Sequence, residues 1–149
     1  MKCIQLLQIK TINSEIQIPS YESSSSAGLD LRAYIPEGNI HLNSKDTLLI
    51  RTGLCLEIPE GYEVQIRPRS GLALKNGISV LNSPGTIDAD YRGEIKVLLI
   101  NHGPETFKIE NEMRIAQMVF AKYEKIQFKK VDDLSESKRG SGGFGSTGI

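Results

Sequence analysis

Apolar and polar side chains alternate along most of this chain, and this alternation constrains the fold more than any other feature. In residues 47–58, every second side chain from Leu48 to Ile58 falls on one face, and these are apolar except for one threonine. Residues 62–67 and 94–100 show the same period of two, which is typical of half-buried β-strands. Turn-forming sequences separate the runs: PEG at 36–38 and 59–61, NSKD at 43–46, NG at 76–77, SPG at 83–85 and HGPE at 102–105. Many short strands joined in this way predict an all-β sandwich, jelly roll or barrel.

One short helix is predicted, from Ser70 to Gly77. A serine before a helix accepts hydrogen bonds from its first free amides, so we expect Ser70 to cap this helix. The pair Asn76-Gly77 is expected to end it, because glycine readily adopts the left-handed conformation found after helices.

The chain has 149 residues, which fits one domain with one core. The strand pattern stops near Val131, and a polar segment leads into the glycine-rich end RGSGGFGSTGI. We therefore expect a β-domain over residues 1–131. Residues 132–149 are expected to be a linker and a mobile tail of the same domain.

The composition argues against several classes of partner. Eighteen basic and eighteen acidic side chains cancel, so we expect no general attraction to nucleic acid or to an anionic membrane. No apolar run approaches the roughly 20 residues that span a bilayer, and the N-terminus lacks the pattern of a signal peptide. Two isolated cysteines and two isolated histidines lack the spacing of metal ligands. A cytoplasmic protein is the expectation.

Several segments carry polar residues that an ordinary β-protein does not need: Asp30 in AGLDLRA, Arg67 and Arg69 in RPRSGLA, Asp88 and Asp90 in TIDADYRG, and Arg114 and Gln117 in RIAQMVF. Each alone has an ordinary structural explanation, such as a charge on a solvated strand face. Together they indicate a site for a polyanion, because arginines and the amides at a helix start bind phosphate oxygens. Carboxylates near phosphates indicate a divalent cation such as Mg²⁺. An aromatic side chain at 144, carried between glycines, is suited to stacking on a base.

Five of these segments resemble, in order, the five signature motifs of the trimeric dUTP pyrophosphatases: AGLDLRA (27–33), PRSGLA (68–73), LNSPGTIDADYRGEI (81–95), RIAQMVF (114–120) and RGSGGFGSTG (139–148). The resemblance covers nearly the whole chain. It implies an all-β, jelly-roll-like β barrel with one short helix and a flexible C-terminal arm. It also implies a homotrimer whose active sites are shared between subunits and closed by the tail.

The activity implied by the resemblance is hydrolysis of dUTP to dUMP and pyrophosphate, with Mg²⁺ held mainly by the triphosphate. This reaction would keep uracil out of DNA and supply dUMP for thymidylate synthesis. Asp88 matches the carboxylate that activates a water for attack on the α-phosphorus. Asp30 matches the residue that contacts the metal through water.

The remaining matches are to substrate-binding positions. Uracil is expected in the turn that contains Leu81, Asn82, Gly85, Thr86 and Ile87, where cytosine would leave buried groups unpaired. Tyr91 matches a ring that packs under deoxyribose and excludes a 2′-hydroxyl. The phosphate contacts and the lid are matched by Arg69, Ser70, Gly71, Gln117, Arg139, Phe144, Gly145, Ser146 and Thr147.

Two other functions remain open on the same scaffold. One is a dCTP deaminase, which shares the fold but needs a different base pocket. The other is a non-enzymatic nucleotide-binding or signalling module. The motifs RSGLA and TIDADYRG and the complete glycine-rich tail favour the pyrophosphatase. The roles of Asp90, Arg92 and Arg114 also stay open: bracing the Asp88 loop by an ion pair, contacting another subunit, or acting indirectly on phosphate.

Overall fold

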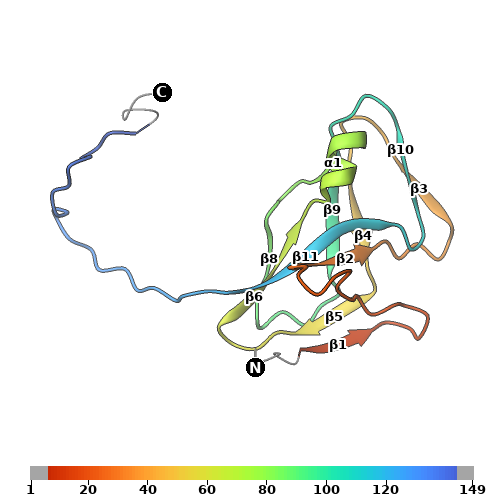
Figure 1. Cartoon of the computed structure of the whole chain (residues 1–149), viewed down its shortest axis with the longest axis horizontal. Coiled ribbons are helices and arrows are strands. Elements are labelled where there is room, and N and C mark those ends of the chain that lie inside the picture. Colours follow the sequence, from red (N-terminus) through yellow and green to blue (C-terminus); the bar gives the residue numbers. More distant parts are fainter. Residues whose placement is uncertain (1–6, 144–149) are drawn as a thin grey trace.

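The computed structural model describes residues 7–143. Within them the chain forms eleven strands and one short helix, which confirms the all-β class (Figure 1). The strands are β1 (Gln8–Thr11), β2 (Gly28–Arg32), β3 (Asn39–Leu42), β4 (Thr47–Arg51), β5 (Leu54–Glu57), β6 (Tyr62–Arg67), β7 (Ile78–Val80), β8 (Gly85–Ile87), β9 (Lys96–Asn101), β10 (Phe107–Glu110) and β11 (Arg114–Lys122). The helix α1 spans Ser70–Asn76 and, with 7 residues, is far too short to cross a membrane.

Two antiparallel sheets enclose the core. One has the order β2-β11-β6-β8 and the other the order β4-β9-β7, while β1 pairs with β5 and β3 with β10. Side chains from both sheets meet in one buried apolar cluster, which includes Leu31, Val64, Ile66, Val97 and Leu99. The arrangement fits the expected jelly-roll-like fold, although the strands form separate sheets and do not close into one barrel.

The alternation in residues 47–58 is real, but the segment is two strands and not one. Gly53 lies between β4 and β5 with a φ of 70°, in the left-handed region that favours glycine. Its amide donates a hydrogen bond to Oε1 of Glu94 at 2.9 Å. The chain therefore changes partner at this point, since β4 pairs with β9 and β5 pairs with β1.

The prediction for the start of the helix was wrong, and the prediction for its end is confirmed. Ser70 is the first helical residue, and the extended residue before it, Arg69, occupies the cap position without a side-chain capping hydrogen bond. Gly77 ends the helix in the left-handed conformation, with a φ of 68°. A Cβ on Gly77 would also lie 2.6 Å from the backbone nitrogen of Gly103, so the loop after β9 packs closely against this turn.

A buried polar side chain fixes that same loop. Asn101, at the end of β9, is 0% exposed. Its amide donates to the carbonyl oxygens of Leu42 at 3.0 Å and Glu105 at 2.8 Å, and its Oδ1 accepts from the Gly103 amide at 2.9 Å. All of its polar atoms are therefore used, as burial demands.

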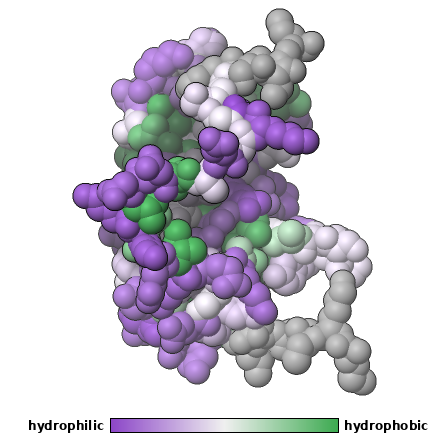
Figure 2. All heavy atoms as spheres, turned by 90° about the vertical axis from the view of Figure 1, so that its left-hand side faces the viewer, coloured by the Kyte–Doolittle hydropathy of each residue, from purple (hydrophilic) through white to green (hydrophobic). Residues whose placement is uncertain are grey.

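Beyond β11 the described chain has no further strand or helix, and it runs away from the body of the domain (Figure 1). Its apolar side chains are exposed, Phe128 to 94% and Leu134 to 87%. On the side from which this tail leaves, apolar patches interrupt a mostly hydrophilic surface (Figure 2). The boundary expected at residue 131 stays a prediction.

Candidate functional site

Three of the expected site segments come together around β11. This strand lies between β2 and β6, so it faces one motif on each side. Gln117 is the register partner of Asp30 on β2 and of Arg67 on β6. The antiparallel pairing of segments far apart in the sequence therefore gathers Asp30, Gln117 and the start of α1 at one place.

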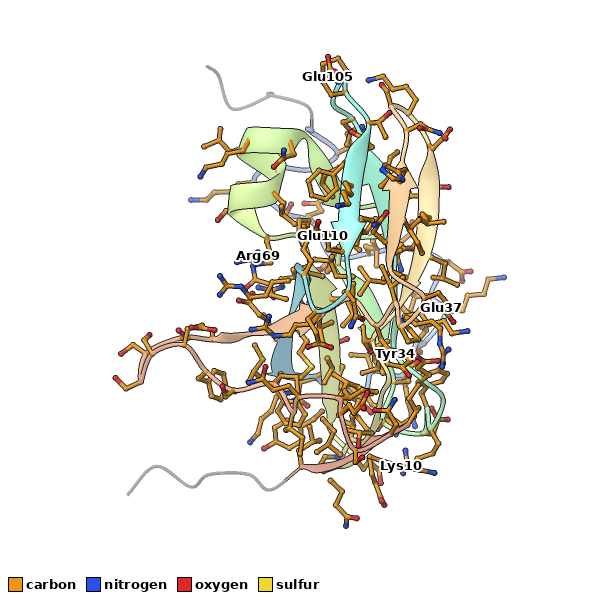
Figure 3. The ribbon with its side chains drawn as sticks, turned by 90° about the vertical axis from the view of Figure 1, so that its right-hand side faces the viewer. Lys10, Tyr34, Glu37, Arg69, Glu105 and Glu110 are labelled. Atoms are coloured by element: carbon orange, nitrogen blue, oxygen red, sulfur yellow. The ribbon has the colours of Figure 1, made fainter. Side chains whose placement is uncertain are left out.

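Asp30 is held between two guanidinium groups. Its Oδ1 lies 2.9 Å from Nε of Arg69, and its Oδ2 lies 3.1 Å from Nη1 of Arg114. Nη1 of Arg69 also donates to the carbonyl oxygen of Arg114 at 3.0 Å. Figure 3 shows Arg69 at the foot of the helix, beside β2 and β11. The side chains of Asp30 and Arg69 are exposed by only 18% and 27%, so this part of the group is partly buried.

Neighbouring residues support this group and the start of α1. Nε2 of Gln117 donates to the carbonyl oxygen of Pro68 at 2.9 Å, which supports the chain just before Arg69. Gly28 makes room for Gln117, because a Cβ at position 28 would collide with its Oε1. Ser70 and Gly71 are exposed at the start of α1, where backbone amides have no partner within the helix.

A second group of expected site residues lies around β8. Gly85, Thr86 and Ile87 form this strand, which pairs with β6 at the edge of its sheet. Asn82 is exposed in the turn before it, and a Cβ on the buried Gly85 would lie 3.0 Å from its Nδ2. Asp88 follows the strand directly.

Asp88 lines two surface cavities. One, of about 370 Å³, is also lined by Thr86, Ile87 and Tyr91, and its volume lies in the range usual for ligand pockets. The other, of about 530 Å³, is lined by Ile58, Glu60, Asp88, Ala89, Asp90, Arg92, Tyr123 and Lys125. In it, a hydrogen bond from Lys125 to Glu60 raises the pKa of the Lys125 ammonium.

The loop after Asp88 is fixed by hydrogen bonds. The hydroxyl of Tyr91 donates to the carbonyl oxygen of Glu94 at 3.1 Å. Arg92 donates to the carbonyl oxygens of Ala89 at 2.6 Å and Tyr91 at 3.1 Å. Arg92 thus braces the loop as one hypothesis required, but through backbone oxygens, and its carboxylate partner is Glu57 at 3.7 Å.

The two groups line no common cavity, although their strands belong to one sheet. Neither cavity that contains Asp88 includes Asp30, Arg69 or Gln117. Arg139, from the tail, donates to the carbonyl oxygen of Gly142 at 2.6 Å. The expected lid residues Phe144, Gly145, Ser146 and Thr147 lie outside the described residues.

Sequence reasoning left out three residues that shape these groups. Arg114 was not placed among the binding residues, although it completes the cluster around Asp30. Gly28 and Gly93 each leave space for a polar site side chain, Gln117 and Tyr91 respectively. Arg114 had stood out as a charge in an apolar strand, but for the two glycines their place inside the motifs was the only available signal, because their contacts depend on strand register and loop conformation.

The residues around Asp30 do not form a metal site by themselves. Among residues 7–143, no three histidine, cysteine, aspartate or glutamate side chains are grouped so that they could hold a metal ion. Both carboxylate oxygens of Asp30 face guanidinium groups. Each oxygen can still accept a further hydrogen bond, so the group fits a cation that arrives with phosphate and is reached through water.

Comparisons with known proteins agree with the resemblance. The sequence model described as dUTPase matches residues 14–148. A deoxyuridine 5'-triphosphate nucleotidohydrolase of Rickettsia bellii is 59% identical over 133 residues, which cover 89% of this chain and 88% of that one. Another, from Fusobacterium nucleatum, is 51% identical over 143 residues, or 95% of this chain and 97% of that one. The solved dUTPase of Staphylococcus bacteriophage 80alpha with dUPNHPP has a TM-score of 0.87 and 25% identity, covering 98% of this chain and 100% of that one.

Proposed function

This chain belongs to the dUTPase family, and on that premise we propose that it hydrolyses dUTP to dUMP and pyrophosphate. One observation carries the proposal: the family match, residues 14–148, includes every residue of the Asp30 group and of the Asp88 group. The geometry of the two groups then suggests which part of the substrate each group binds. The Asp30 group offers donors to phosphates, and the Asp88 group offers a cavity for the nucleoside.

The base would be read by the backbone around β8. As the edge strand of its sheet, β8 pairs with β6 on one side, so its other side has no strand partner among the described residues. Unpaired N–H and C=O groups on such an edge can pair with the O4 acceptor and the N3–H donor of uracil. Cytosine has the reverse pattern and would leave these groups unpaired, and the side chains of Asn82, Thr86 and Ile87 would complete the pocket.

The phosphates would be bound by Arg69, Gln117 and the amides of Ser70 and Gly71. Mg²⁺ bound to the triphosphate would neutralise part of its charge and hold the phosphates in a reactive geometry, with Asp30 reaching the cation through water. Asp88 would take a proton from a water molecule as the water oxygen bonds to the α-phosphorus. The bond from that phosphorus to the pyrophosphate oxygen then breaks, and its electron pair leaves with pyrophosphate.

A complete site would need more than one copy of the chain. The lack of a common cavity for the two groups supports this, as do the exposed apolar side chains beyond β11, Phe128 and Leu134. We propose a homotrimer in which one subunit supplies the Asp30 group and another the Asp88 group. The tail, with Arg139, Phe144, Gly145, Ser146 and Thr147, would close over bound nucleotide.

Mixed assemblies test this sharing. Subunits carrying Asp88→Asn should be co-assembled with subunits that end at Lys138, each kind being nearly inactive alone. Shared sites predict partial recovery of dUTP hydrolysis, because some sites receive an intact Asp88 and an intact tail from different chains. No recovery in assemblies shown by mass spectrometry to be mixed would mean that Asp88 and the tail act from the same chain.

The cellular role would be to keep dUTP low, so that uracil stays out of DNA, and to supply dUMP for thymidylate synthesis. The proposed location is the cytoplasm, where deoxynucleotides are made. This role needs no nucleic-acid contact, in keeping with the balanced charge of the chain.

One assay tests the activity against its alternatives. The protein is incubated with Mg²⁺ and, separately, with dUTP, dCTP, dTTP and UTP, and pyrophosphate and ammonia are measured. We expect pyrophosphate from dUTP and little from the other three. Ammonia from dCTP would establish a deaminase, and binding of dUTP without any product would establish a non-enzymatic binding module.

A further inference from the structure

Gly93 leaves open the space that the ring of Tyr91 occupies. A Cβ on Gly93 would lie 2.6 Å from Cζ and 3.0 Å from Cε2 of Tyr91, and would collide with its hydroxyl oxygen. Side chains do not tolerate such contacts, so a residue other than glycine at position 93 and this ring position exclude each other. The φ of Gly93 lies outside the left-handed region, so its backbone conformation does not itself require glycine. What matters at this position is the missing side chain.

The ring has little freedom to move aside while keeping its hydrogen bond. Its hydroxyl donates to the carbonyl oxygen of Glu94, and the backbone amide of Tyr91 donates to the carbonyl oxygen of Asp88 at 3.2 Å. The Glu94 side chain is itself fixed, because its carboxylate accepts from Nε of Arg51 at 3.0 and 3.1 Å and from the Gly53 amide at 2.9 Å. With a side chain exposed by only 14%, Glu94 anchors the far end of the ring to the β4–β5 connection.

The position of the ring matters because it forms one wall of the cavity that contains Asp88. Tyr91 is 45% exposed and lines this cavity together with Thr86 and Ile87. A side chain at position 93 would force the ring out of this position. The wall and the water-activating carboxylate belong to one hydrogen-bonded turn, so the ring also sets where a sugar lies relative to Asp88.

We propose that Gly93 is a specificity-determining residue: by leaving room for the ring of Tyr91, it fixes the surface that accepts deoxyribose and rejects ribose. This inference rests on the proposed hydrolysis of dUTP. Gly93 acts through Tyr91 and is a positioning residue. Its replacement should therefore lower the ratio of kcat/KM for dUTP to that for UTP, while the protein still folds.

The test uses the full chain with Gly93→Ala, Tyr91→Ala and the double variant. In Gly93→Ala, the ratio of kcat/KM for dUTP to that for UTP should fall by about tenfold or more, the scale on which small steric differences discriminate substrates. In the Tyr91→Ala background the same glycine substitution should have no further effect, because the ring that it displaces is absent. An equal loss in both backgrounds would overturn the proposal.

A second measurement follows the ring directly. With tyrosine labelled by ¹³C, the ring signal of Tyr91 is identified by its loss in Tyr91→Ala, and it should shift clearly in Gly93→Ala. An unchanged signal together with unchanged discrimination would overturn the proposal. If Gly93→Ala does not fold but the double variant does, the collision is established by that rescue; if neither folds, the glycine serves the backbone and the proposal fails.

These readouts also separate the inference from the function on which it rests. A wild-type protein that does not hydrolyse dUTP would refute the proposed function, and the role in sugar discrimination with it. A wild-type protein that hydrolyses dUTP and rejects UTP, beside a Gly93→Ala variant that rejects UTP equally well, would refute the role of Gly93 alone.

Discussion

Asp30 and Arg69 form an ion pair across two motifs, with Nε of the arginine 2.9 Å from Oδ1 of the carboxylate. The second carboxylate oxygen is bound by Arg114, so Asp30 orients two guanidinium groups at once. It sets the direction in which the free donors of Arg69 point.

Replacement of Asp30 by asparagine should therefore weaken turnover mainly by releasing Arg69. A charged hydrogen bond contributes about 1.5–3 kcal/mol, so we expect kcat/KM for dUTP to fall roughly 10- to 100-fold. The loss should be similar at every Mg²⁺ concentration tested. Full recovery at high Mg²⁺ would show that Asp30 acts chiefly on the water shell of the metal.

The variant Asp88→Asn should bind dUTP but hydrolyse it at least about 100-fold more slowly, because the amide cannot take the proton from water. Binding is measured by calorimetry with a non-hydrolysable dUTP analogue, and turnover by release of pyrophosphate. Asp90→Asn is the matched control, because Asp90 is also an exposed aspartate of this loop but does not line the cavity shared by Asp88 and Tyr91. Normal turnover in Asp88→Asn would remove Asp88 from its proposed role.

A chain that ends at Lys138 should fold and assemble but lose roughly 100-fold or more in kcat, the scale for loss of donors to a transition state. The residues just before this point are exposed and lie outside the core, so removal of the residues after Lys138 should not disturb the strands. Light scattering would report the assembly, and pyrophosphate release the rate. If the shortened chain works at the normal rate, the glycine-rich end has no part in catalysis.

Gly77→Ala should destabilise the fold more than Gly61→Ala. Both glycines have a positive φ, 68° and 84°, and a left-handed alanine costs roughly 1–2 kcal/mol. Only at Gly77 would the new Cβ also meet backbone, the nitrogen of Gly103 at 2.6 Å, whereas at Gly61 it would meet nothing within 4 Å. The free energy of unfolding, from denaturant titration at one protein concentration, should therefore fall by at least about 1 kcal/mol more for Gly77→Ala. Equal losses would mean that the loop after β9 shifts freely.

The sequence was sufficient to predict the class of fold, because a period of two is typical of β-strands: residues 62–67 form β6, and the alternation in residues 94–100 runs into β9, which begins at Lys96. It also predicted the end of α1, since Gly77 is a local signal. It did not predict the start of the helix. Arg69 takes the cap position in an extended conformation while its side chain is bound to Asp30, a contact across the sheet that no local pattern reveals.

The same limit applies to the site. The motifs identified Asp30, Arg69 and Gln117 as separate candidates. Their proximity in space depends on β11 lying between β2 and β6, which the sequence does not reveal. Arg114 gained its place from that pairing as well. Gly93 matters because it has no side chain, and this can be recognised only in the structure, where the ring of Tyr91 occupies the space that a Cβ would need.

The three side-chain hydrogen bonds of Asn101 link the end of β3, the loop after β9 and the segment before β10. If one of these segments moved away from the others, a buried polar atom of the Asn101 side chain would lose its hydrogen bond. This end of the domain should accordingly exchange its amide hydrogens as one cooperative unit, with the amide of Gly103 protected to the same degree as those of β9.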